Sequence, residues 1–164
     1  MREIPIQYIR KIRQNKVELE KRLRVRISFK GRTIFLNGES EIDEYFAERV
    51  IKAMDFPFLT SDAMLLSNEN YSLEIINLKD YTRRKDFRTI KGRIIGTKRK
   101  SLRTIENLSG AIIALKDNSV AIISLSDEIE YVRQAIISII HGSKHGNVYS
   151  RLERINKRLS KDKY

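Results

Sequence analysis

The sequence predicts an α+β protein made of two tandem copies of one small unit, followed by a helix at the C-terminus. Three observations support this: a repeat spaced by 86 residues, β-branched runs alternating with helical patterns, and basic blocks separated by acidic ones. With 164 residues, of which 41% are hydrophobic, the chain can form two small packed cores. We expect domains over 1–58 and 72–143, a connector over 59–71 and a basic helix over 144–164.

The repeat is visible when the chain is moved by 86 residues, which aligns Ile9–Met54 with Ile95–Ile140 without a gap. Nine of the 46 aligned positions are identical, and many hydrophobic positions also correspond. The identical pairs include Glu20/Glu106, Ile27/Ile113 and Tyr45/Tyr131. We interpret the pattern as an internal duplication.

Each copy has the order strand, helix, helix, strand, strand, helix. In the first copy we expect strand Glu3–Ile6, helix Val17–Leu23, strands Val25–Phe29 and Thr33–Leu36, and a helix capped by Ser40 that continues to Met54. In the second copy we expect strand Ser72–Leu78, a helix ending at Ser109-Gly110, and strands Ala111–Leu115 and Val120–Leu125. A further helix follows, which begins at the capping pair Asp127 and Glu130 and ends at Gly142. A short helical piece near 63–66 and a tail helix over 147–160 complete the prediction.

The most specific motif surrounds Gly96. The segments Ile95–Ile105 and Ser109–Ile113 fit the KH type I consensus, I-G-x-x-G-x-x-I-x-x-I followed after three residues by T-G-A-x-I, except that Arg99 replaces the second loop glycine. Because the element order also agrees, the sequence predicts two tandem KH type I domains. The first is degenerate, since its aligned loop, Arg10-Lys11-Ile12-Arg13, contains no glycine.

Charge and motif together indicate a nucleic-acid ligand. The net charge is +12, and residues 81–103 hold ten basic side chains and one acidic one. A glycine turn at a helix start lets phosphate approach backbone N–H groups, and an aliphatic groove beside it holds about four single-stranded nucleotides. The expected RNA-binding residues are Lys91, Arg93, Ile94, Ile95, Gly96, Thr97, Lys98, Arg99, Lys100, Leu102, Arg103 and Ile113, with a secondary basic surface of Arg10, Lys11 and Arg13. Arg99 either replaces a backbone contact with its guanidinium or obstructs the phosphate, and its positive charge favours the first.

Composition argues against enzyme classes. The chain has no cysteine and two histidines, so it offers neither a thiol nucleophile nor a Cys-ligated metal site. Its carboxylates lie on expected helix starts, where the macrodipole favours them, and no Gly-rich nucleotide loop is present. We expect His141 to cap helix carbonyls and His145 to stack on a base or shape the turn. We therefore expect a binding protein without catalytic residues, metal or cofactor, located in the cytoplasm and not in a membrane.

The chain resembles the archaeal and eukaryotic ribosome-assembly KH proteins known as partner-of-Nob-one, which are related to the Krr-type KH proteins. The resemblance rests on the degenerate first unit and on three segments: Asp80–Lys85, Ile90–Gly96 and Gly142–Tyr149, the last of the form G-x-x-H-G-x-V-Y. It covers almost the whole chain and looks like the archaeal form, which is little more than two KH domains.

This resemblance implies a small-subunit assembly factor that binds single-stranded rRNA near its 3′ end through the second KH domain. It implies that the first KH domain supports this binding and contacts protein. The implied partners are the endonuclease that matures the rRNA 3′ end and the alpha subunit of initiation factor two. An alternative from the same residues is a KH adaptor in translation initiation or RNA processing that acts mainly as a protein scaffold.

Overall fold

A computed structural model describes residues 1–162 and divides the chain into two compact units, Met1–Leu73 and Glu74–Tyr164. The last two residues of the helix expected over 144–164 lie outside the described residues. The division between the units falls within a strand, Tyr71–Asn77. The finer division of the chain at residues 58, 71 and 143 stays a prediction.

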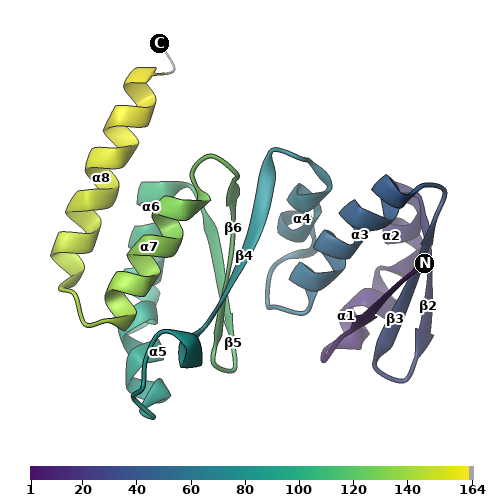
Figure 1. Cartoon of the computed structure of the whole chain (residues 1–164), viewed down its shortest axis with the longest axis horizontal. Helices are drawn as coiled ribbons and strands as arrows, with labels where there is room; N and C mark the ends of the chain where they lie inside the picture. Colours follow the sequence, from purple (N-terminus) through teal and green to yellow (C-terminus); the bar gives the residue numbers. More distant parts are fainter. Residues whose placement is uncertain (163–164) are drawn as a thin grey trace. The chain divides into compact units, whose positions relative to one another are not determined.

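The first unit has three helices on one face of a three-stranded sheet (Figure 1). Its elements are β1 (Arg2–Pro5), α1 (Ile9–Gln14), α2 (Lys16–Leu23), β2 (Val25–Lys30), β3 (Thr33–Gly38) and α3 (Glu41–Met54), followed by α4 (Thr60–Ala63) and the 3-10 turn η1 (Met64–Ser67). Strand β3 lies between β1 and β2 and is antiparallel to both, with Ile34 opposite Ile4 and Leu36 opposite Ile27. These four side chains are buried and form the sheet side of the core.

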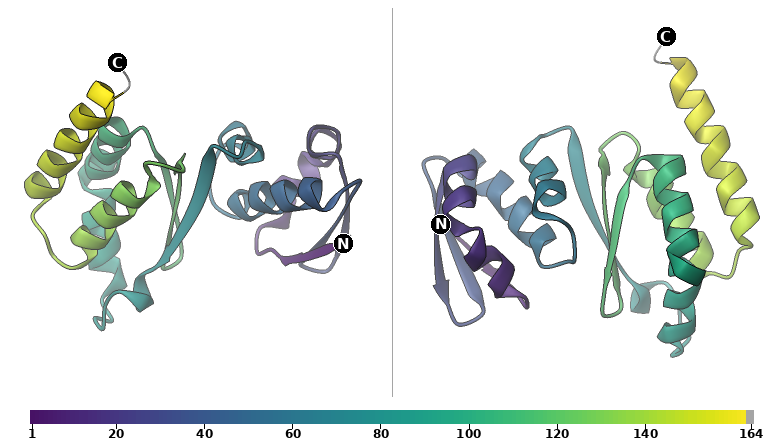
Figure 2. Two further views of the ribbon diagram at one scale, coloured as in Figure 1. Left: turned by 45° about the horizontal axis from the view of Figure 1, so that its top comes forward. Right: turned by 180° about the vertical axis from the view of Figure 1, so that it is seen from behind.

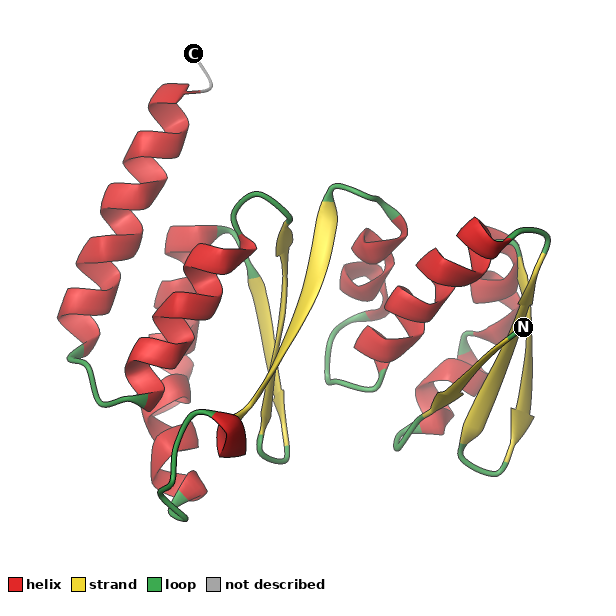
Figure 3. Ribbon diagram, viewed as in Figure 1, coloured by secondary structure: helices red, strands yellow, loops and turns green. Residues whose placement is uncertain are grey.

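The second unit repeats this arrangement and adds a helix (Figure 3). Its elements are β4 (Tyr71–Asn77), η2 (Leu78–Asp80), α5 (Phe87–Ile95), η3 (Thr97–Arg99), α6 (Lys100–Ser109), β5 (Ile112–Lys116), β6 (Ser119–Leu125), α7 (Ile129–Ile140) and α8 (His145–Asp162). The strand order is β4-β6-β5, the counterpart of β1-β3-β2. Helix α8 packs on α6 and α7 at one side of this unit (Figure 2). Its Val148 and Leu152 belong to the hydrophobic core. The expected α+β fold with KH-type topology and a C-terminal helix is confirmed.

The two units share local geometry at aligned positions. The Glu20 Oε1 atom accepts a hydrogen bond of 3.0 Å from the backbone N–H of Ile27, and Glu106 Oε2 accepts one of 3.2 Å from the N–H of Ile113. All four residues belong to identical pairs of the sequence repeat. In each unit this carboxylate therefore ties the helix before the hairpin to the first hairpin strand.

Backbone conformation also repeats. Arg24 and Gly110 end α2 and α6 with φ of 56° and 75°, and the hairpin residues Gly31 and Asp117 have φ of 60° and 52°. Left-handed conformations at helix ends and tight turns suit glycine, so the arginine and the aspartate adopt them because the fold requires them.

Two local predictions are wrong. The expected loop Arg10–Arg13 lies inside α1, and the break between helices falls at Asn15, whose φ of −108° and ψ of 11° are ordinary values for a residue with a side chain. Without glycine, the chain continues the helix instead of making the glycine-dependent turn of the second unit. The Asp127–Glu130 capping pair does not form, because α7 starts later, after Glu128, without a side-chain cap. The predicted cap at Ser40 is confirmed by a 3.1 Å bond from the N–H of Asp43 to Ser40 Oγ.

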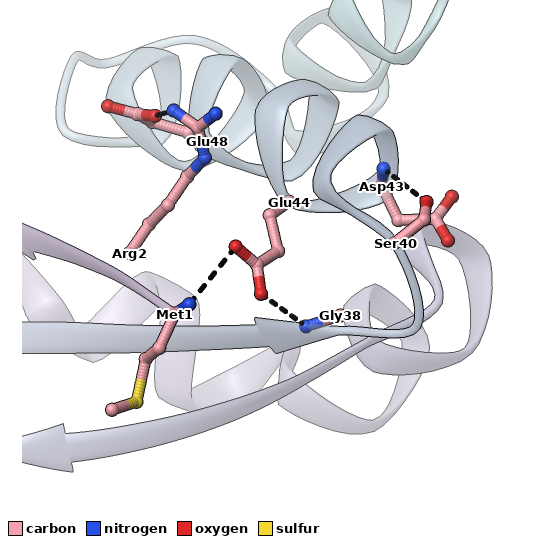
Figure 4. A network of polar contacts seen from close by, with 7 residues as sticks. All are labelled: Met1, Arg2, Gly38, Ser40, Asp43, Glu44 and Glu48. Carbon is pink, nitrogen blue, oxygen red and sulfur yellow. Dashed lines mark hydrogen bonds and ion pairs between the residues drawn. The ribbon is translucent and has the colours of Figure 1, made fainter.

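A polar network joins the start of β1 to α3 (Figure 4). The buried Glu44 carboxylate accepts a 3.1 Å hydrogen bond from the backbone N–H of Gly38 and lies 3.3 Å from the Met1 amine. The bond from Gly38 holds the pKa of Glu44 below its ordinary value, and the Met1 amine acts in the same direction. Arg2 pairs with Glu48 beside it, so β1 is attached to α3 by two ion pairs.

Position 24 offers a direct test of the repeat geometry. Replacing Arg24 with glycine should raise the free energy of unfolding by about 0.5–1 kcal/mol, because glycine adopts a positive φ without the steric cost that a Cβ imposes. The matched change Gly110→Ala should lower it by about 1 kcal/mol, since a Cβ there meets no atom within 4 Å and only the backbone is strained. Urea unfolding measures both, and a loss of stability in Arg24→Gly would contradict the shared geometry.

Candidate nucleic-acid interface

The turn between α5 and α6 is built on Gly96. Its φ of 75° and ψ of 170° end α5 directly after Ile95. A Cβ at this position would lie 2.7 Å from the backbone nitrogen and 2.8 Å from the Cβ of Ser101, so no side chain fits. The absence of a Cβ thus lets the first turn of α6 lie against the loop.

The rest of the loop consists of exposed residues that project from the start of α6. Lys98 and Arg99 have consecutive left-handed conformations, with φ of 52° and 63°. The N–H of Arg99 donates a 3.2 Å bond to the carbonyl of Gly96, and Arg99 is the residue that precedes α6. The first N–H groups of a helix have no acceptor within it and carry partial positive charge, which favours an anion at this end.

Exposed cations surround this helix start. Lys98, Arg99, Lys100 and Arg103 are exposed, and Lys91 is half-buried on α5. Within residues 1–162 none of these five side chains forms an ion pair with a carboxylate. Their charge is therefore available to an external anion. The half-buried Ile95 and the exposed Thr97 lie beside them.

Arg93, for which contact with RNA stays a prediction, is hydrogen-bonded within the protein. Its Nη1 donates a 2.8 Å bond to the carbonyl of Ile139, and its Nη2 donates a 2.7 Å bond to the carbonyl of Ser143. The guanidinium therefore caps the C-terminal end of α7, where carbonyl groups lack partners within the helix. This is the capping role that the sequence assigned to His141.

The predicted aliphatic floor of the groove is not exposed. Ile94, Leu102 and Ile113 are 0%, 2% and 3% exposed and pack with Ile105 in the core of the second unit. Their contact with RNA stays a prediction. The consensus gives the positions of these residues along the chain but not the direction of their side chains. Their positions on α5, α6 and β5 place the side chains on the faces that form the core.

The three residues of the predicted secondary basic surface also differ, because one is bonded within the protein and two are exposed. The Lys11 ammonium donates to the carbonyl oxygens of Phe56 and Phe58, and burial lowers the pKa of Lys11. Arg10 and Arg13 remain exposed, and the Arg13 guanidinium lies 4.7 Å from the centre of the Phe29 ring.

The histidines join distant segments of the second unit. His145 Nε2 lies 2.7 Å from the carbonyl of Arg93, and His141 Nε2 lies 2.9 Å from the carbonyl of Tyr81. His145 thus fixes the start of α8 to α5, which gives a structural role to the G-x-x-H-G-x-V-Y segment. The turn-shaping alternative for His145 fits these contacts.

Sequence reasoning missed Ser101. It is 4% exposed, and its Oγ has no hydrogen-bond partner in the described part of the chain. Its signal was its position opposite Gly96, which the consensus alone does not reveal. Across residues 1–162 no three acidic or histidine side chains gather to hold a metal ion. Nor does any helix in that range have the length and hydropathy needed to cross a bilayer.

Comparisons with known proteins agree with the KH topology. Residues 72–157 match the family model of the eukaryotic type KH domain, KH domain type I. The chain is 30% identical to the KH domain-containing protein MJ0443 of Methanocaldococcus jannaschii, over 72% of this chain and 52% of that protein. It is 31% identical to the pre-rRNA-processing protein PNO1 of Debaryomyces hansenii, over 87% and 58% respectively. The chain thus spans little more than half the length of these relatives.

A solved structure covers nearly the whole chain. The fold superposes with a TM-score of 0.86 on a chain in the crystal structure of an a/eIF2alpha–aDim2p–rRNA complex from Pyrococcus horikoshii. The sequences are 32% identical, over 96% of this chain and 94% of that one.

The contacts of Arg93 predict a stability defect instead of a binding defect. Arg93→Gln should lower the free energy of unfolding by about 2 kcal/mol, because two hydrogen bonds from a charged group to backbone carbonyls are lost. The matched change Lys91→Gln, on the same helix, should leave stability within about 0.5 kcal/mol of the parent. Thermal or urea unfolding distinguishes the two. Equal stability of both variants would show that the guanidinium does not hold α7.

Proposed function

We propose, because the chain belongs to the PNO1/Dim2 type of KH domain type I proteins, that it is an RNA-binding factor of ribosome biogenesis. The observation that carries this proposal is the loop Gly96–Arg99. There a turn that excludes any Cβ presents the start of α6 among exposed, unpaired cations. Pre-rRNA processing in the names of relatives and rRNA in the Pyrococcus complex support RNA as the ligand.

In finer detail, the ligand is single-stranded rRNA of the small subunit near its 3′ end, and the second unit binds it. A phosphate group occupies the N-terminal end of α6 beside Gly96, where no side chain blocks the backbone. Lys98, Arg99, Lys100 and Arg103 neutralise neighbouring phosphates, and phosphate contacts of this kind set position and affinity more than sequence preference. The function is binding, without a chemical step.

The first unit has a supporting role. Its helix α1 continues where the second unit has the loop, and Lys11 is bound internally, so Arg10 and Arg13 supply only general attraction to RNA. Its other surfaces contact protein. The alpha subunit of initiation factor two is the partner that the Pyrococcus complex supports. The endonuclease that matures the rRNA 3′ end is the second partner of the proposal.

Salt dependence tests the phosphate contacts. If the four exposed cations of the loop and α6 each neutralise one phosphate of a single strand, the logarithm of the association constant falls against the logarithm of salt concentration with a slope of about −3. Affinity then drops roughly 50-fold between about 50 and 200 mM salt. Fluorescence anisotropy with a labelled single-stranded RNA measures the slope, and a slope near zero would refute the proposal.

Arg99 is the residue at which this loop departs from the consensus. Two substitutions distinguish the effect of its charge on RNA binding from the effect of its side-chain bulk. Arg99→Glu should weaken RNA binding by more than about tenfold, because a repulsive charge replaces a phosphate contact. Arg99→Gly should change affinity less than that while raising stability, since glycine removes the cost of the positive φ. A sharp gain of affinity in Arg99→Gly would mean that the side chain obstructs the phosphate.

A further inference from the structure

A concave surface of the second unit lies between α7 and α8, which lie beside each other in Figure 1. It is a hollow of about 150 Å³ whose floor is formed by the buried Ala135, Val148 and Leu152. Its walls carry polar groups from both helices, namely Tyr131, Gln134 and Ser138 on α7 and Asn147 and Arg151 on α8. We call this hollow the α7–α8 cleft.

The α8 wall of the cleft is strongly basic. An adjoining hollow of about 290 Å³ shares Tyr131, Arg151 and Ile155 with the cleft and adds Arg154 and Arg158. The three arginines lie three and four residues apart, on one face of the helix, where like charges destabilise each other. All three are exposed, and no carboxylate in residues 1–162 pairs with them.

The acidic side chains near this wall are already engaged. Glu153 of α8 lies 3.8 Å from Lys157. Glu130, next to Tyr131, accepts hydrogen bonds from Arg133 and Gln134 at 3.1 and 2.9 Å. The wall therefore keeps its positive charge, and an external polyanion would relieve the repulsion among its arginines.

Tyr131 provides an exposed aromatic ring opposite this charge. It is 41% exposed, and its ring contacts neither another aromatic ring nor a cation in the described part of the chain. Its repeat partner Tyr45 differs, because Arg2 and Arg49 each lie 5.8 Å from the centre of that ring. Both tyrosines are exposed, but the first unit places two of its own cations against Tyr45, whereas no cation of the described residues lies against the ring of Tyr131.

We propose that the α7–α8 cleft binds one nucleotide of single-stranded RNA, separately from the loop at Gly96. The base stacks on Tyr131 above the apolar floor, and the adjoining phosphates contact Arg151, Arg154 and Arg158. An exposed aromatic ring beside unpaired arginines is the combination that single-stranded nucleic acid uses, because every base offers a planar face and every linkage a charge. An acidic peptide would satisfy the arginines but would leave the ring and the apolar floor without a planar partner. The proposal rests on RNA being the ligand of the proposed function.

The test is an NMR titration of the full chain with a single-stranded RNA of about twelve nucleotides, which is longer than the roughly four that one KH groove holds. We expect shifts of the amide signals of Tyr131, Ser138 and Asn147 as well as those of Gly96–Arg99. The cleft shifts should persist in Arg99→Glu, in which the loop contact is weakened. A poly-glutamate peptide serves as the acidic competitor.

Paired variants measure the contribution to affinity. The double change Arg154→Gln and Arg158→Gln should weaken RNA binding about tenfold, whereas the control Lys157→Gln and Lys161→Gln removes the same charge from α8 but should cost less than about threefold. Tyr131→Leu keeps an apolar side chain without a stacking face and should cost about fivefold. Circular dichroism confirms that each variant is folded.

The outcomes separate the two proposals. Shifts in the loop but not in the cleft, or equal losses in the cleft and control variants, would overturn the cleft assignment and leave the proposed function intact. Shifts in neither place would overturn both. Stronger shifts of the cleft signals with poly-glutamate than with RNA would assign the cleft to an acidic protein partner instead of a nucleotide.

Discussion

The second unit depends on a turn that has no space for a Cβ. At Gly96 the turn between α5 and α6 is so tight that a side chain would overlap the backbone of Ser101. The turn places the start of α6 at the surface, and it leaves α5 in position to hold α7 through Arg93. In the first unit, α1 and α2 instead meet at Asn15, which has ordinary dihedral angles. The residues aligned with the loop of the second unit, Arg10–Arg13, lie within helix α1.

This contrast explains how two copies of one topology differ in chemistry. Both units keep the strand order, the bond from a helix glutamate to the first hairpin strand, and the left-handed residue at the end of the second helix. These shared features stabilise the fold. The loop, by contrast, carries no part of the core, since Thr97–Lys100 are exposed. Without glycine there, the first unit has no such turn at this point, and the packing of the unit stays intact.

Much of the fold follows from local sequence patterns. Hydrophobic periodicity and turn residues predicted each strand and the helices α2, α3, α7 and α8 with ends within a few residues, because those signals act between near neighbours. They gave no bounds for α5. The roles of Arg93 and Lys11 were not predictable in this way. Their acceptors are backbone carbonyls more than forty residues away, and a carbonyl has no signature in the sequence. The burial of Ile94, Leu102 and Ile113 was not predictable from the motif for a related reason, since a consensus gives spacing but not depth.

The uneven attachment of α8 has a consequence for its motion. The buried anchors Val148 and Leu152 lie in its first half, whereas Ile155 and Leu159 are only half-buried, and Ser160–Asp162 are exposed. Amide hydrogen exchange should therefore be slow around Val148 and progressively faster toward Asp162, as the final turns open without disturbing the core. Arg151, Arg154 and Arg158 lie along the part of α8 over which this local stability decreases. A surface of this kind can adjust the spacing of its charges to an irregular strand while its anchored end keeps the register.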